Sequence, residues 1–252
     1  MREPVGGTNR PRPYSSYRRL AQYCARPPFA LEHLHPRDAD HVIYRNPKPV
    51  RTTEQGTRPA ALVLTPLELI GRIAALVMDV NCPWSVAQAL AVADEVRASD
   101  LLWFEEPVWP PEDFAGLAEV RKRGGIKTAA GENCISAQHF DYMLRAGAVD
   151  YAQPSVTKIG GITEFLKVMQ ITAQHGATLM PHSPYFGPGL LATVHLLSTL
   201  PIETMVEYSF TDLGTNPLGD AIAMVNGRIA VPQGPGLGAD PDLRIVEQYR
   251  VK

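Results

Sequence analysis

A short apolar run that ends in an acid recurs along most of this sequence, and it limits the folds that the chain can adopt. The run Val77-Met78 is followed by Asp79 and, two residues later, by Asn81. Side chains alternate along a strand, so Asp79 and Asn81 are expected to point the same way. A carboxylate at the end of a buried strand is costly unless it is paired or binds a metal. Asp79 is therefore a candidate site residue.

Similar strands alternate with amphipathic helices from Thr65 to about residue 207. The first expected strand ends at Asp79, and the others cover 101–104, 127–130, 149–153, 178–180 and 204–207. The expected helices cover 67–75, 85–99, 111–123, 136–146, 162–175 and 189–200. Strands and helices that alternate in this way indicate βαβ units with parallel pairing.

The spacing of these units indicates the architecture. Six strands recur at intervals of 23–27 residues, which is the length of one βα unit of a (β/α) barrel. We therefore predict an α/β fold, a partial TIM-type barrel with about six of the usual eight βα units. A doubly wound sheet is the alternative, but it usually carries a glycine-rich phosphate turn after its first strand, and none is present.

The N-terminal part differs in composition. Residues 1–60 contain ten Arg and nine Pro, and scattered prolines interrupt the periodicity of both helices and strands. We predict an Arg/Pro-rich irregular arm over 1–64 and the partial barrel over 65–252. A basic nucleic-acid arm is the alternative. We expect no nucleic-acid partner, because the arginines are diluted by prolines and acids rather than clustered.

Other features of the chain bound its surroundings. The three cysteines, Cys24, Cys82 and Cys134, form no CxxC pair, which suits free thiols in a reducing compartment. The sequence has no run of about 18 apolar residues that would predict a transmembrane helix, and its N-terminus has no apolar signal region. We expect a cytoplasmic protein without membrane contact.

In a (β/α) barrel the residues that follow the strands carry the chemistry. In this chain they are Asp79, Glu105, Glu132, Ser155, His182 and Glu207. The first three are acids at intervals of 26 and 27 residues. Adjacent parallel strands lie about 4.8 Å apart, so the three acids should converge and repel one another. A divalent cation removes that repulsion, and all-oxygen ligands favour Mg²⁺ over Zn²⁺.

The segments around these acids resemble the enolase superfamily. The metal-ligand motifs are matched by Asp79-Val80-Asn81, Phe104-Glu105-Glu106-Pro107 and Gly131-Glu132-Asn133. The sixth-strand motif, the seventh-strand motif and the C-terminal closure are matched by 153–161, 181–183 and 234–238. The order and spacing resemble the catalytic domain of the mandelate racemase / muconate lactonizing group, over roughly Ala74 to Val251.

The resemblance implies a homo-oligomer that acts on a small carboxylate substrate, a hydroxy acid or sugar acid, and it also implies a reaction and a set of roles. Mg²⁺ binds a substrate carboxylate, a base removes the α-proton, and the metal stabilises the enediolate. The implied metal ligands are Asp79, Glu105 and Glu132. The implied catalytic residues are His182, as general acid or base, and Glu207, which hydrogen-bonds the substrate carboxylate. Asn81, Ser155 and Lys158 are the candidate substrate-binding residues.

Two features depart from the family pattern. Ser155 stands where the racemase branch has an Asp paired to the histidine, although a hydroxyl could still fix the imidazole tautomer. Before Asp79 there is no recognisable capping domain and no Lys-x-Lys motif, and the one lysine within 1–78 is Lys48. We therefore expect residues 1 to about 70 to be a truncated or frame-shifted replacement of the ancestral sequence.

These features together predict a Mg²⁺-dependent lyase that abstracts the proton α to a carboxylate. We expect an acid-sugar dehydratase in which His182 is the acid that expels the 3-hydroxyl. Dehydration is favoured over racemisation or epimerisation, because a racemase needs two opposed bases and this chain offers one at most. A non-catalytic or truncated remnant of the superfamily is the open alternative.

Overall fold

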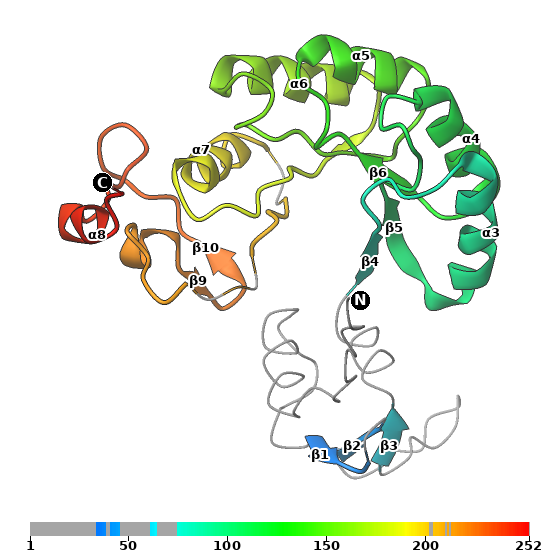
Figure 1. Cartoon of the computed structure of the whole chain (residues 1–252), viewed down its shortest axis with the longest axis horizontal. Coiled ribbons are helices and arrows are strands. Elements are labelled where there is room, and N and C mark those ends of the chain that lie inside the picture. The colour runs from blue at the N-terminus through cyan, green and yellow to red at the C-terminus, as the bar shows by residue number, and fades with distance from the viewer. Residues whose placement is uncertain are drawn as a thin grey trace, which may run out of the picture. The chain divides into compact units, whose positions relative to one another are not determined.

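The computed structural model describes residues 34–38, 41–45, 61–64, 75–201, 204–209, 211 and 213–251. The chain divides into two compact units, Met1–Ala75 and Leu76–Lys252, and Figure 1 labels the elements of both.

The first unit contains a three-stranded antiparallel sheet. In it β1 (Leu34–Pro36) pairs with β2 (Val42–Arg45), and β2 pairs with β3 (Ala61–Leu64). These strands were not predicted from the sequence, since each is three or four residues long and lies among prolines and arginines. The remainder of the predicted arm lies outside the described residues, as does almost all of the helix predicted over 67–75.

The second unit contains a five-stranded parallel sheet in the order β4-β5-β6-β7-β8. Its strands are β4 (Leu76–Asp79), β5 (Leu101–Glu105), β6 (Thr128–Ala130), β7 (Tyr151–Ala152) and β8 (Thr178–Leu179). Each strand pairs with the next one along the chain, as in a (β/α) barrel and unlike a doubly wound sheet. The predicted α/β class and its parallel βα units are confirmed. Over the described residues the sheet is open between β4 and β8.

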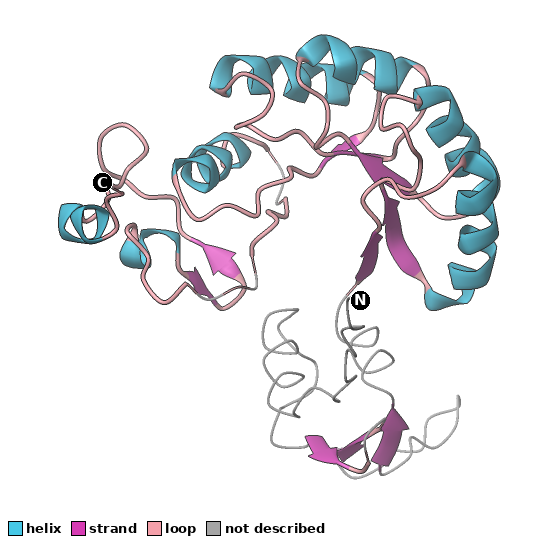
Figure 2. Cartoon of the chain, viewed as in Figure 1, coloured by secondary structure: helices cyan, strands magenta, loops and turns pink. Residues whose placement is uncertain are grey.

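Helices follow the strands and lie outside them in Figure 2. They are α3 (Val86–Val96) with the 3₁₀ turn η2 (Arg97–Ser99), α4 (Phe114–Gly124), α5 (Ala137–Arg145), α6 (Ile162–Gln174) and α7 (Pro188–Leu197). Side-chain caps mark the starts of α3, α4 and α5, whereas α6 and α7 begin after glycines without one. Ser85 and Gln88 form a capping box at α3. Asp113 accepts from the Gly116 N–H, so α4 begins at Phe114 rather than at Pro111.

The chain ends in smaller elements. These are η3 (Gly219–Ile222), the antiparallel pair β9 (Met224–Val225) and β10 (Arg228–Ile229), and α8 (Leu243–Gln248). Among the described residues, every helix is too short or too polar to cross a bilayer.

The strand predicted over 204–207 does not form. Thr204 Oγ1 donates to the Leu179 carbonyl at 3.4 Å, and Ser183 Oγ donates to the Glu207 carbonyl at 2.9 Å. The segment therefore lies beside the end of β8 and is held by side chains. A backbone ladder cannot continue there, because β8 is two residues long and Pro181 has no N–H to donate.

Both faces of the sheet are apolar, as expected for parallel strands. The face toward the helices packs against Phe140, Phe165 and Met143, which are fully buried. Neighbouring side chains on β5 point to opposite faces, so Phe104 joins this cluster and Trp103 joins a second one. The second cluster consists of Trp103, Ala129, Tyr151 and Met180. Charged groups are therefore accommodated mainly beyond the strand ends.

Asp150 ties the amino end of the sheet to α4. Its Oδ1 accepts from Arg121 Nη2 at 2.8 Å, and its Oδ2 accepts from the Thr128 N–H at 3.0 Å. Arg121 also donates to the Gly147 carbonyl at 3.1 Å. Burial alone would raise the pKa of Asp150, but the hydrogen bonds from Arg121 and Thr128 outweigh it and lower the pKa.

We expect Asp150→Asn to destabilise the second unit by about 1.5 to 3 kcal/mol at neutral pH, because it weakens charge-assisted hydrogen bonds. A lowered folded-state pKa means that the carboxylate stabilises the fold above its unfolded pKa. That contribution is lost as pH falls through the folded pKa, which lies below 3.8. Urea unfolding at neutral pH and near the folded pKa measures the difference.

The matched control is Asp94→Asn, which disrupts an exposed ion pair with Arg97 on the surface of α3. Exposed pairs contribute little, so this variant should unfold like the parent. A gap between parent and Asp150→Asn that persists unchanged at low pH would contradict the assignment.

Candidate active site

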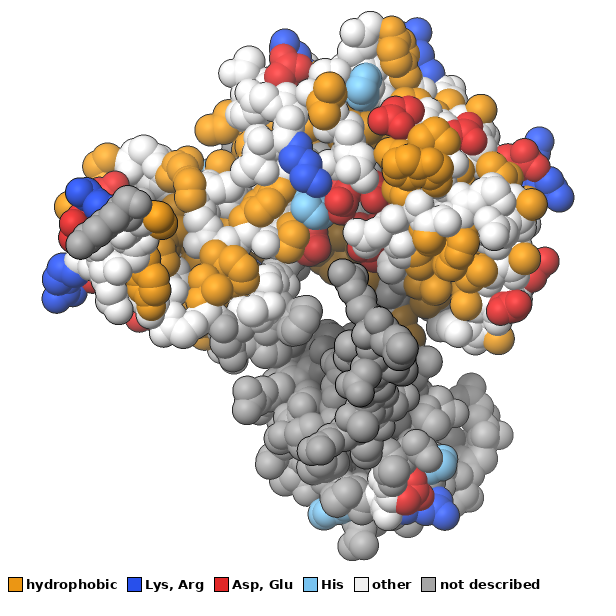
Figure 3. Space-filling model, viewed as in Figure 1, with side chains coloured by type: hydrophobic (Ala, Val, Ile, Leu, Met, Phe, Trp, Pro, Cys, Tyr) orange, Lys and Arg blue, Asp and Glu red, His pale blue; other side chains and the backbone are white. Residues whose placement is uncertain are grey.

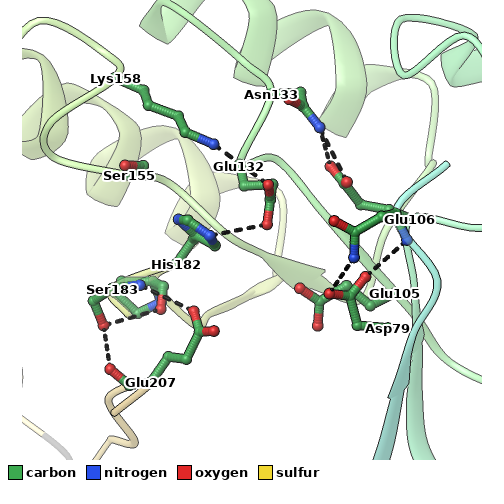
Figure 4. A network of polar contacts seen from close by, with 12 residues as sticks. Asp79, Glu105, Glu106, Glu132, Asn133, Ser155, Lys158, His182, Ser183 and Glu207 are labelled. Atoms are coloured by element: carbon green, nitrogen blue, oxygen red, sulfur yellow. Dashed lines mark hydrogen bonds and ion pairs between the residues drawn. The ribbon is translucent and has the colours of Figure 1, made fainter. Parts of the chain in front are cut away.

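The carboxyl ends of the strands bring several acids to one edge of the sheet. β4 and β5 pair in a register that puts Asp79 opposite Glu105. Figure 4 shows these two side chains together, with Lys158 and His182 pointing toward Glu132. On the face seen in Figure 3, acidic side chains gather in a hollow beside a histidine. The predicted strand-end acids therefore share one region.

Asn81 orients Asp79. The Asn81 N–H donates to Asp79 Oδ1 at 3.0 Å, and its side-chain Nδ2 donates to Oδ2 at 2.6 Å. Asn81 has a φ of 54°, in the left-handed region that Asn tolerates better than most residues. The amide predicted to face a substrate thus also fixes the first acid.

Glu105 is a buried carboxylate, 6% exposed, that accepts from Trp103 Nε1 at 2.8 Å. Burial raises its pKa, the hydrogen bonds from Trp103 and Gln153 oppose this, and the charges of Asp79 and Glu132 raise it further. Among the described residues, no Lys or Arg forms an ion pair with Glu105 or Asp79. A cation could therefore stabilise this pair of acids.

Glu106 is held apart from Glu105. Its carboxylate accepts from Asn133 Nδ2 at 2.8 and 3.0 Å and from Cys82 Sγ at 3.4 Å. Burial, followed by the charge of Glu132, raises the pKa of Glu106 to about 7. Glu106 therefore supports the loops around the site.

Glu132 contacts two predicted site residues. Its Oε2 lies 3.0 Å from His182 Nε2, and its Oε1 lies 3.3 Å from Lys158 Nζ. The side chain of His182 is 13% exposed. Burial lowers the pKa of His182, against the opposing effect of Glu132 and with a further lowering by Lys158. The lowered pKa favours the neutral imidazole.

Ser155 does not open onto the site. It is fully buried, and its hydroxyl is hydrogen-bonded to the hydroxyl of Tyr185. The Tyr185 hydroxyl also lies 3.1 Å from His182 Nδ1. This contact was not predicted from the sequence, although the three-residue spacing of His182 and Tyr185 in one loop was a signal for it.

Glu207 lies beside the same acids. Its Oε2 accepts from the Ser183 N–H at 3.0 Å. Desolvation raises the pKa of Glu207 to about 7, with that hydrogen bond opposing the shift and the charge of Glu105 reinforcing it. Residues 204–207 form no strand, but Glu207 still lies at the site.

A family model described as enolase C-terminal domain-like matches residues 57–245 of the chain. The chain belongs to the enolase superfamily, in its mandelate racemase group. A curated relative, the D-galactarolactone cycloisomerase of Agrobacterium fabrum, is 30% identical over 197 residues, which cover 73% of this chain and 51% of the relative. Other matched relatives include an L-talarate/galactarate dehydratase, an arabinonate dehydratase and an L-rhamnonate dehydratase.

Solved structures agree with this assignment. The 3,6-anhydro-D-galactonate cycloisomerase of Zobellia galactanivorans is similar at 31% identity with a TM-score of 0.65, covering 74% of this chain and 53% of that one. The L-talarate dehydratase of a Polaromonas species, solved with Mg and L-glucarate, is similar at 28% identity with a TM-score of 0.60, covering 71% and 48%. The chain spans about half the length of these relatives.

The three acids are the right kind of ligand for Mg²⁺, but in this structure they do not lie close enough together to hold the ion. Three carboxylates follow successive strands, and oxygen donors are what Mg²⁺ prefers. Within the described residues, however, no three Asp, Glu, His or Cys side chains lie close enough to hold an ion. Asp79 and Glu105 are adjacent, whereas Glu132 is engaged by Lys158 and His182.

The acids of this superfamily site also act on a neighbouring thiol. Burial, followed by the charge of Glu106, raises the pKa of Cys82 to about 12 from 9.0. We expect Cys82 in the folded protein to react with iodoacetamide at pH 8 about a thousandfold more slowly than an unshifted thiol, because the thiolate is the nucleophile. Glu106→Gln should speed the reaction. Mass spectrometry of the cysteine peptides measures both rates.

Cys134 is the internal control, since it is 5% exposed and should stay unreactive in both proteins. Equal rates for Cys82 in folded and urea-unfolded protein would overturn this electrostatic description.

Proposed function

We propose that this chain carries the metal-binding and acid–base residues of an acid-sugar dehydratase. The enzyme would be a Mg²⁺-dependent lyase that removes the proton α to a carboxylate and expels the 3-hydroxyl. One observation carries the proposal. His182 Nε2 contacts Glu132 at 3.0 Å, at the edge of the sheet where Asp79 lies opposite Glu105. A proton carrier and three carboxylates of a metal-binding type therefore occupy one region.

We assign the metal to Asp79, Glu105 and Glu132. A bound Mg²⁺ would supply positive charge beside the substrate carboxylate as that group becomes more negative. The buried Glu105, raised in pKa by its surroundings, supports this assignment because a cation would relieve its desolvation. The Mg in the similar L-talarate dehydratase also supports it.

We assign the proton movements to His182. Burial lowers the pKa of His182, which favours the neutral imidazole. Once Glu132 turns from Nε2 to the metal, the tautomer that carries its proton on Nδ1 can accept the α-proton on Nε2. The electrons of the broken C–H bond form the new carbon–carbon double bond as the bond to the 3-hydroxyl breaks. The imidazolium then gives its proton to the departing oxygen, which leaves as water. Dehydration needs one such group, whereas racemisation needs a second base on the opposite face.

The remaining polar residues are assigned to the substrate. Glu207 has a pKa of about 7, so near neutral pH a protonated fraction can donate a hydrogen bond to a substrate carboxylate. Asn81 lies beside Asp79 and can reach a substrate hydroxyl. Ser155 is fully buried, so we assign it to support of the histidine rather than to substrate binding.

Two variants separate metal binding from proton transfer. Asp79→Asn removes a ligand, so both the Mg²⁺-induced rise in melting temperature and turnover should be lost. His182→Asn leaves the three acids in place, so the melting shift should remain while turnover falls by about a hundredfold or more. The measurements are thermal unfolding with and without Mg²⁺, and keto-acid formation from a panel of aldonic and aldaric acids.

His175→Gln is the matched control, because this histidine lies at the exposed end of α6. It should change neither readout. Full turnover in His182→Asn would remove His182 from the mechanism.

Lys158 competes with the metal for Glu132. Its ammonium lies 3.3 Å from Glu132 Oε1 and would repel an incoming cation. We expect Lys158→Met to bind Mg²⁺ about tenfold more tightly, as measured by calorimetric titration. Lys167→Met, which breaks an exposed pair with Glu164 on α6, is the control and should leave the affinity unchanged. Weaker binding in Lys158→Met would show that Lys158 supports the metal site.

The cycloisomerases among the relatives favour a second candidate. In this chain such a reaction would remove the α-proton as a ring carbon–oxygen bond opens, and the same acid–base residues would serve. Sugar-acid lactones and anhydro sugar acids in the substrate panel distinguish the two. Mg²⁺ stabilisation without turnover of any acid would instead support a non-catalytic remnant.

A further inference from the structure

The ring of His182 is bonded at both nitrogens. Nε2 faces Glu132 at 3.0 Å, and Nδ1 lies 3.1 Å from the hydroxyl of Tyr185. The two rings also meet edge to face, with centroids 5.7 Å apart and planes at 78°. Tyr185 thus contacts the Nδ1 edge of the imidazole, opposite the Nε2 atom that faces Glu132.

Tyr185 is part of a chain of hydroxyl groups. Its hydroxyl bonds to Ser155 Oγ, which lies 3.1 Å from Thr157 Oγ1. Ser155 is fully buried, so water cannot readily replace this partner. The chain runs from the imidazole through three hydroxyls to the loop after β7.

The position of the Tyr185 ring is also fixed by packing. A Cβ on Gly189, at the start of α7, would lie 3.1 Å from Tyr185 Cδ2 and 2.6 Å from Thr157 Cγ2. Gly189 therefore leaves just enough space for this loop against α7. The ring packs against the cluster that contains Leu190 and Leu191, which are almost fully buried.

We propose that Tyr185 is the positioning residue for His182, and that it keeps Nε2 as the atom that exchanges protons with the substrate. The proposal rests on the proposed function for its kinetic consequence, but not for the hydrogen bond itself. Within the described part of the chain, the hydrogen bonds of Tyr185 go to Ser155 and His182 and not to the acids that we assign to the metal. It acts through the imidazole.

The chemistry of hydroxyls suits this role. A hydroxyl both donates and accepts, so the chain can point either way. When Nδ1 carries a proton, it donates to Tyr185, Tyr185 donates to Ser155, and Ser155 donates to Thr157. Nδ1 keeps this proton both before and after Nε2 accepts one from the substrate, so the same hydrogen bonds hold His182 in both protonation states that acid–base catalysis requires. With every bond reversed, Nδ1 accepts and Nε2 carries the proton, which is the tautomer that donates to the Glu132 carboxylate.

The test is Tyr185→Phe, which keeps the ring and its packing but removes the hydroxyl. In protein labelled with isotopic histidine, nitrogen NMR should show a changed Nδ1 resonance for His182, assigned by its absence in His182→Gln. This readout needs folded protein and no turnover. It therefore decides the hydrogen bond even if no substrate is found. An unchanged resonance would overturn the proposal.

The kinetic arm uses the best acid from the panel, with saturating Mg²⁺. Loss of a group that orients a catalytic residue commonly costs about ten- to a hundredfold. We expect kcat to fall by that factor with KM within about twofold. Tyr142→Phe on the exposed face of α5 is the matched control and should change neither kcat nor the His182 signal. A rise in KM with kcat retained would instead assign Tyr185 to substrate binding and overturn the positioning role.

A second variant covers a folding failure of Tyr185→Phe. Ser155→Ala removes the hydroxyl that supports Tyr185 and should shift the Nδ1 resonance in the same direction by a smaller amount. Gly189→Ala should disturb the signal through displacement of Tyr185 and Thr157. If both leave the His182 resonance as in the parent, the hydroxyl chain does not position the histidine.

Discussion

Negative charge concentrated at one edge of a parallel sheet is the constraint on which this site depends. Successive strands end in acids, and their register brings Asp79 and Glu105 together. Glu106 and Glu207 add charge nearby, and desolvation raises the pKa of each to about 7. Acids that crowd in this way must be protonated, paired or bound to a cation. In the proposed chemistry Glu207 is partly protonated, Glu132 is paired with Lys158 and His182 until the metal binds, and Asp79 and Glu105 bind the cation.

The acids differ in their hydrogen-bond partners, and this difference indicates their roles. Neutral donors hold Asp79 and Glu105, through Asn81 and Trp103 respectively. Such donors fix a carboxylate without cancelling its charge, so both remain attractive to a metal. Glu132 instead contacts Lys158 and His182. It is the acid whose partners must change when a cation binds, and the link between the metal and the proton carrier.

The parts of this structure that could be predicted from the sequence are those set by local rules. The βα period, the strand ends and helix caps such as Ser85 depend on neighbours along the chain. The strands β1–β3 depend on pairing between short segments, and the absence of a strand over 204–207 depends on Pro181 ending the ladder of its neighbour. The contact of Glu132 with Lys158 depends on side-chain reach across two loops, which periodicity does not report.

The serine at position 155 gains a physical reason from this charge balance. A carboxylate at this position would orient the imidazole by its charge. It would also add another negative charge to a region where several acids already repel one another. A hydroxyl chain through Tyr185 orients the ring without that cost, because hydroxyls carry no net charge. It also adds no negative charge that would oppose the lowering of the His182 pKa by burial. The departure from the family pattern is thus compatible with acid–base work, provided that Tyr185 remains in place.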